Sequence, residues 1–159
     1  MAKVKVYICS SFPRRKEAQM LALKLSPIME IVSTWHRDDL TVVPRVPNNP
    51  EILQRAMRDF SQLRKSQLVI VFIGDTLTGG GRHTELGLAL GMRKDIMLIG
   101  LYDPNPFELI PYLRHYDTAD ELVESFKVLR EDIEADFKWR DEQAELNATE
   151  EPDKEITIN

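Results

Sequence analysis

Residues 79–91 of the chain read Gly-Gly-Gly-Arg-His-Thr-Glu-Leu-Gly-Leu-Ala-Leu-Gly, and an apolar run from Leu68 to Ile73 precedes them. A short run that is apolar throughout is typical of a parallel strand buried on both faces. The glycines predict a loop, and the small residues after them predict a helix that begins near Arg82. Ligands of open α/β sheets bind where such loops follow the strands. This order of elements predicts an α/β fold and places Glu85 in the first turn of a helix beside a ligand site.

The alternation of apolar runs and helical patterns continues on both sides of this stretch. Strands and helices that alternate with short connections indicate a parallel sheet, and right-handed crossovers place helices on both of its faces. We therefore expect a single three-layer domain, Rossmann- or flavodoxin-like, with a mainly parallel sheet of four to five strands. The expected strands are Val4–Cys9, Glu30–Trp35, Leu68–Ile73, Ile96–Leu101 and a short edge strand, Arg114–Asp117, and the expected helices are Arg14–Met29, Glu51–Lys65, Arg82–Arg93 and Thr118–Leu146.

The length and composition limit the class of protein. A chain of 159 residues fits one domain, which we assign to residues 1–146, followed by an acidic tail, 147–159, that we expect to be disordered. The net charge of −5 argues against a nucleic acid polymer as partner. No apolar run approaches the roughly 18 residues of a membrane span, so we expect a cytoplasmic protein with no membrane partner. Cys9 is the single cysteine and the three histidines lack metal-ligand spacing, so no metal site is expected.

Glu85 is the strongest candidate for chemistry. The positive end of a helix dipole is expected to keep a carboxylate in the first turn ionised. An ionised carboxylate that points into a pocket can attack, or stabilise, a positively charged sugar carbon. The alternative is that Glu85 only favours the start of the helix.

Two further stretches of sequence support the interpretation that Glu85 attacks or stabilises a sugar carbon. Residues 6–11 read Val-Tyr-Ile-Cys-Ser-Ser, residues 58–63 read Arg-Asp-Phe-Ser-Gln-Leu, and the helix after the glycines carries Glu-Leu-Gly-Leu-Ala at 85–89. In this order and spacing the chain resembles the nucleoside 2-deoxyribosyltransferase superfamily, which includes the deoxynucleoside 5′-monophosphate N-hydrolases. The resemblance covers about residues 4–101 and implies catalytic roles for Tyr7, Asp59 and Glu85.

The resemblance implies that Glu85 attacks C1′ of a deoxyribose and forms a covalent glycosyl-enzyme intermediate. Asp59 would protonate or hold the departing base, and the Tyr7 hydroxyl would position Glu85 or the sugar. Each has a structural alternative: Asp59 as a solvated helix position among arginines, and Tyr7 as a core aromatic whose hydroxyl is satisfied.

Polar and aromatic residues near the expected strand ends are candidates for binding the substrate. Arg82, His83 and Thr84, with the free amides of the helix start, could form a small anion site or simply cap the helix. Trp35 and His36 could stack on a base, although a tryptophan here often packs under a loop. The remaining candidates are Ser10, Ser11 and Phe12 in the turn after the first strand, and Asp75 after the central strand.

Together these features predict an enzyme that cleaves the N-glycosidic bond of a nucleoside or nucleoside 5′-monophosphate. The sugar would pass to water or to a second base, no cofactor would be needed, and the resemblance implies a homo-oligomer. One alternative is a non-catalytic nucleotide-binding module, favoured by Gln67, which stands where many relatives have an aspartate. Another is a small α/β adaptor that binds a partner through its acidic C-terminal helix.

Overall fold

The computed structural model describes residues 3–38, 49–74, 81–101, 106–111 and 113–128. The chain forms two compact units, residues 1–123 and 124–159, and each is described by itself. Residues 119–123 of the first unit and 124–128 of the second are helical. The predicted domain end at residue 146 and the predicted tail, 147–159, lie outside the described residues.

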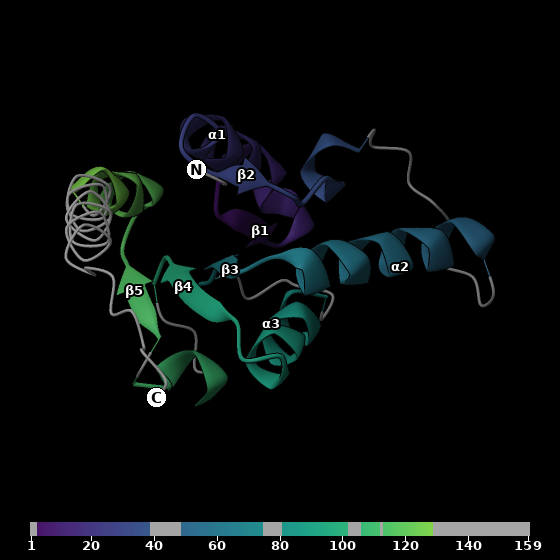
Figure 1. Cartoon of the computed structure of the whole chain (residues 1–159). Helices are drawn as coiled ribbons and strands as arrows, with labels where there is room; N and C mark the ends of the chain where they lie inside the picture. The colour runs from purple at the N-terminus through teal and green to yellow at the C-terminus, as the bar shows by residue number, and fades with distance from the viewer. Residues whose placement is uncertain (1–2, 39–48, 75–80, 102–105, 112, 129–159) are drawn as a thin grey trace, which may run out of the picture. The chain divides into compact units, whose positions relative to one another are not determined.

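Five parallel strands form one sheet in the order β2-β1-β3-β4-β5 (Figure 1). Every pair of neighbouring strands is parallel, from β1 with β2 to β4 with β5. The predicted α/β fold with a parallel sheet is therefore confirmed. The strands are β1 (Lys5–Cys9), β2 (Glu30–Ile31), β3 (Leu68–Phe72), β4 (Asp95–Ile99) and β5 (Arg114–Tyr116).

Helices cover both faces of this sheet. Tyr7 and Cys9 of β1 belong to one buried cluster with Leu63 and Leu86, which come from the helices on that face. The side chains of a strand alternate between the two faces, so Ile8, also fully buried, points to the other layer. Figure 1 shows α1 and α3 on opposite sides of the sheet. The α-helices are α1 (Arg15–Leu25), α2 (Pro50–Lys65) and α3 (Gly81–Gly91), and the short 3-10 helices are η1 (Phe12–Arg14), η2 (Trp35–Arg37) and η3 (Pro106–Leu109).

The second strand is shorter than the sequence predicts. Only Glu30 and Ile31 pair with β1, and the chain turns into η2 at Trp35. The reason is a side chain, because the Ser33 hydroxyl accepts the hydrogen bond from the Ile8 amide at 3.1 Å. A strand carbonyl would otherwise satisfy that amide. The edge strand thus ends early, and Trp35 and His36 lie in a turn instead of at a strand end.

Two glycines allow the ends of β3 and β4 to lie close together. Gly74 and Gly100 have φ angles of +89° and +119°, a region that other residues rarely adopt. A Cβ at Gly100 would lie 2.6 Å from the Ile73 carbonyl oxygen, which also accepts a 2.7 Å hydrogen bond from Arg14 Nη1. The close contact between these backbones therefore brings the C-terminal ends of β3 and β4 together.

Gly100→Ala is therefore expected to lower the free energy of unfolding by about 1–3 kcal/mol. The new Cβ would clash with the Ile73 carbonyl oxygen, and alanine would be strained at this positive φ angle. Gly87→Ala is the matched control, since a Cβ there meets nothing within 4 Å and the position is helical. That substitution should raise stability by up to about 1 kcal/mol. Urea unfolding of both variants measures the difference, and equal effects would contradict the expectation.

Candidate active site

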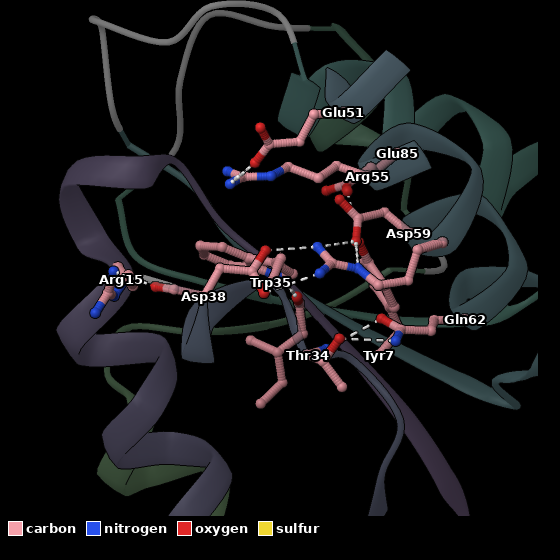
Figure 2. A network of polar contacts seen from close by, with 12 residues as sticks. Tyr7, Arg15, Thr34, Trp35, Asp38, Glu51, Arg55, Asp59, Gln62 and Glu85 are labelled. Atoms are coloured by element: carbon pink, nitrogen blue, oxygen red, sulfur yellow. Dashed lines mark hydrogen bonds and ion pairs between the residues drawn. The ribbon is translucent and has the colours of Figure 1, made fainter. Parts of the chain in front are cut away.

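Three side chains from three elements meet on the α2/α3 face of the sheet. The Tyr7 hydroxyl of β1 donates a 2.6 Å hydrogen bond to Glu85 Oε1 of α3. The negative charge of Asp59, on α2, raises the pKa of both residues. Figure 2 shows the carboxylates of Asp59 and Glu85 close to each other. The three residues that the sequence predicted as catalytic are thus brought together.

The position and charge of Glu85 differ from the prediction. Glu85 is the fifth residue of α3, which begins at Gly81, so it lies just beyond the first turn. The influence of a helix dipole falls off within that turn. Burial instead raises the pKa of Glu85 to about 7, although the neighbouring Cys9 thiol and the hydrogen bond from Tyr7 act to lower it. The expectation that the helix end keeps Glu85 ionised was wrong, and near neutral pH the carboxyl group exchanges between its two forms.

Tyr7 stays a hydrogen-bond donor throughout this exchange. Its side chain is fully buried, and burial together with the charge of Glu85 raises the pKa of its hydroxyl far above the usual value. The thiol of Cys9, also fully buried, has a raised pKa for the same two reasons. Glu85 therefore accepts a hydrogen bond from the neutral Tyr7 hydroxyl, lies beside the neutral Cys9 thiol, and meets no ionised group of β1.

Asp59 has a different environment, because a cation contacts it. Arg58 Nε and Nη2 donate to Asp59 Oδ1 at 3.0 and 2.9 Å. Burial raises the pKa of Asp59, and the hydrogen bonds and charge of Arg58 act against that rise. The neighbouring arginines left a solvated helix position as the alternative for Asp59, but Arg58 places its charge against the candidate site.

The helix that carries Asp59 is fixed to the turn after β2. Gln62 Oε1 accepts from the Thr34 amide at 3.0 Å, and Gln62 Nε2 donates to the Thr34 hydroxyl at 2.8 Å. Next to it, Trp35 Nε1 donates to the Ile8 carbonyl at 2.7 Å. These bonds fix α2 relative to β1, and with it the distance between Asp59 and Tyr7.

The predicted substrate-binding residues divide into accessible and buried ones. His36 is 1% exposed and Ser11 is 6% exposed, so the imidazole of His36 cannot stack on a base in this conformation. Phe12 is 57% exposed. Ser10, Trp35 and His83 are partly buried and Thr84 is exposed, while Asp75 lies outside the described residues.

Arg82 is not available to a phosphate in this conformation. Its guanidinium is completely buried, donates to the Phe72 carbonyl at 3.3 Å and forms an ion pair with Glu108 of η3 at 3.5 Å. The Arg82 carbonyl also accepts a 3.6 Å hydrogen bond from the Cys9 thiol. Glu108 was not among the residues predicted from the sequence, and its position between Phe107 and Leu109 in a short apolar segment was the one available signal. Arg82 therefore anchors the start of α3.

Gln67 lies away from the catalytic candidates. Its side-chain oxygen accepts a 3.0 Å hydrogen bond from the Lys5 amide, at the N-terminal end of β1. Glu85 follows the opposite, C-terminal end of the sheet. Gln67 therefore holds the start of β1, away from Tyr7 Oη and Glu85.

The described parts of the chain contain no cluster of three or more His, Cys, Asp or Glu side chains that could hold a metal ion. Among the same residues, no helix is long and apolar enough to cross a membrane.

Comparison with known proteins supports the fold. No protein-family model and no curated protein matches the sequence. A solved structure of 2-deoxyribosyltransferase from Bacillus psychrosaccharolyticus, however, aligns with a TM-score of 0.58 at 15% identity, over 76% of this chain and 90% of that one. The chain has the 2-deoxyribosyltransferase fold. This confirms, at the level of the fold, the resemblance noted in the sequence.

Two other structures share the 2-deoxyribosyltransferase fold with this chain. CMP N-glycosidase from Clostridium botulinum aligns with a TM-score of 0.52 at 19% identity, over 78% of this chain and 98% of that one. A conserved protein from Enterococcus faecalis aligns with a TM-score of 0.54 at 14% identity, over 79% of this chain and 98% of that one.

The raised pKa of Glu85 predicts a pH-dependent cost in stability. A carboxyl group whose pKa is higher in the folded state disfavours folding once it must ionise, so the cost is absent below about pH 4.5 and complete above about pH 7. Glu85→Gln removes the charge. It should therefore stabilise the protein by about 1–3 kcal/mol more at pH 8 than at pH 4.5.

Denaturant unfolding at the two pH values measures this change, and Glu17→Gln provides a control of opposite sign. The hydrogen bond from Arg14 lowers the pKa of Glu17, so removing that carboxylate should cost stability above pH 4.5, by a small amount because Glu17 is exposed. A Glu85→Gln effect that is independent of pH would contradict the assignment.

Proposed function

We propose that the protein cleaves the N-glycosidic bond of a nucleoside or nucleoside 5′-monophosphate, with Glu85 as the nucleophile. The observation that carries this proposal is the meeting of Tyr7, Glu85 and Asp59, with a 2.6 Å bond from the tyrosine hydroxyl to the glutamate. The similar structures of a 2-deoxyribosyltransferase and a CMP N-glycosidase support the choice of this bond.

In the first step, the ionised Glu85 oxygen bonds to C1′ while the bond from C1′ to the base nitrogen breaks. The electron pair of that bond leaves with the base, and Asp59, in its protonated form, gives its proton to the base nitrogen. Positive charge develops on the sugar, and a nearby carboxylate stabilises it. Because Tyr7 donates to Glu85 Oε1, it orients the carboxylate and leaves Oε2 to attack.

In the second step, water or another base attacks C1′ and breaks the ester with Glu85. Asp59, now a carboxylate, accepts the proton from water, or from the nitrogen of the incoming base. Neither step needs a cofactor. Since only the ionised form of Glu85 attacks, activity should rise as the pH passes through about 7.

The accessible candidates provide the proposed substrate contacts. Phe12 and Trp35 would face the base, Ser10 and Thr84 would bind the sugar or a 5′-phosphate, and His83 would add a hydrogen bond to a phosphate. Asp75 remains a proposal from the sequence alone. Ser11, His36 and Arg82 are buried and are better explained as supports of these residues.

Glu85→Gln should reduce release of free base by at least about 10³-fold, because the covalent route is lost. The assay incubates the protein with a panel of deoxynucleosides, ribonucleosides and their 5′-monophosphates, with and without a second base, and follows the products by chromatography. Glu51→Gln, an exposed carboxylate on α2, is the matched control and should retain full activity. Tight binding without base release by the wild type would instead show a non-catalytic nucleotide-binding module.

We also propose a cytoplasmic homo-oligomer that associates through α2. Leu53, Met57 and Phe60 are 63%, 60% and 39% exposed, and their spacing places them on one side of the helix. An exposed apolar stripe of this kind is typical of an interface. A second copy of the chain is the occupant that the resemblance implies.

Met57→Glu should therefore lower the molar mass in sedimentation from a multiple of 18.4 kDa to that of the single chain. Leu23→Glu, which changes an equally exposed leucine on α1, should leave the mass unchanged. A wild-type protein that sediments as a single chain would refute the assembly.

A further inference from the structure

Arg58 joins two carboxylates that are far apart in the sequence. Its Nη1 and Nη2 atoms donate to the two oxygens of Asp38 at 2.8 and 2.7 Å. Its Nε and Nη2 atoms donate to Asp59 Oδ1 at 3.0 and 2.9 Å. Figure 2 shows these bonds as dashed lines from Asp38 to Asp59. One planar guanidinium thus fixes the orientation of two acidic side chains.

The far end of this bridge is itself held in place. Arg15 Nη1 of α1 donates to the Asp38 carbonyl at 2.7 Å. The Arg58, Asp38 and Asp59 side chains are only 31%, 25% and 24% exposed, so water screens their interactions less than those of a surface pair. Geometry and partial burial together make the bridge more rigid than an ordinary surface ion pair.

The bridge to Arg58 uses only one of the two carboxyl oxygens of Asp59. Both hydrogen bonds from Arg58 fall on Oδ1, and the described residues provide no partner for Oδ2. Asp59 also lies near Glu85, and two carboxylates at such a place repel each other. When Asp59 is ionised, Arg58 compensates its charge and lets the two acidic groups stay close.

We propose that Arg58, clamped by Asp38, is a positioning residue that aims Asp59 Oδ2 at the departing base. This role rests on the proposed cleavage of an N-glycosidic bond. When the Oδ2 hydroxyl gives its proton to the base nitrogen, Asp59 becomes negative, and the Arg58 guanidinium stabilises that charge. When water later attacks the sugar, its proton returns to Oδ2.

Removal of the guanidinium is expected to slow the chemical step more than it weakens binding. Arg58→Met should lower kcat by about 10- to 100-fold with a smaller change in KM, because Asp59 loses its orientation. Arg58→Lys keeps the charge but cannot span both carboxylates, so it should restore only part of the rate. Arg55→Met removes an equal charge from the same helix, paired with Glu51 and not hydrogen-bonded to Asp59, and should keep nearly full activity.

A double-mutant cycle tests the clamp. Asp38→Asn breaks the far half of the bridge, so it should lower kcat, and combining it with Arg58→Met should add little further loss. Fully additive losses would show that the two residues act separately and would overturn the role of Asp38. Thermal unfolding of each variant checks that the fold is kept.

A second measurement is independent of enzymatic activity. The groups that act electrostatically on Asp59 include Arg58, Asp38 and Arg55, and Asp59 in turn acts on Tyr7 and Glu85. NMR titration of ¹³C-labelled aspartate carboxyl groups, with the Asp59 signal assigned by its loss in Asp59→Asn, reports its pKa directly. Arg58→Met should raise that pKa by about 1 unit or more, and Arg55→Met by much less.

The kinetic measurement and the NMR titration together distinguish a failure of the positioning role from a failure of the proposed function. An unchanged Asp59 titration in Arg58→Met, or wild-type kcat in that variant, overturns the positioning role even when the wild type releases base. A wild type that releases no base refutes the proposed function. In that case the titration still decides whether Arg58 controls Asp59.

Discussion

The hydrogen bond between Tyr7 and Glu85 is the contact on which the site depends. Tyr7 is fully buried in the middle of the sheet, and a buried hydroxyl without a partner costs about 1–3 kcal/mol. Glu85 needs donors as well, because burial disfavours its charge. The glutamate therefore supplies the acceptor that the hydroxyl needs, and the hydroxyl supplies a donor to the glutamate. The 2.6 Å bond also joins β1 to α3, so the contact that satisfies the core holds the proposed nucleophile in place.

The two carboxyl groups of the candidate site have unequal surroundings, as the roles proposed for them require. Asp59 is paired with a guanidinium, whereas Glu85 receives a hydrogen bond from the Tyr7 hydroxyl, which stays neutral. Environments that separate the behaviour of two acidic groups are a common way to divide the roles of nucleophile and acid. Here the difference in surroundings follows from the elements that carry the partners: α2 carries Arg58, and β1 carries Tyr7 and Cys9.

The sequence predicted those features that local patterns encode. The apolar run of β3 indicated a central parallel strand, and the resemblance to the nucleoside 2-deoxyribosyltransferase superfamily implied that Tyr7, Asp59 and Glu85 would meet. The sequence could not predict the features that depend on contacts between residues far apart along the chain. The burial of Arg82 requires Glu108 from another segment, and the raised pKa of Glu85 follows from packing around it. The early end of β2 likewise depends on one serine hydroxyl that replaces a strand carbonyl.

The buried pair of Arg82 and Glu108 constrains how this chain can diverge. Loss of either partner alone strands an uncompensated charge in the interior, whereas exchange of both for apolar side chains of similar volume can be nearly neutral. Descendants of this sequence should therefore change the two positions jointly, through a coordinated double replacement. Positions 82 and 108 would then covary across an alignment, although 26 residues separate them along the chain.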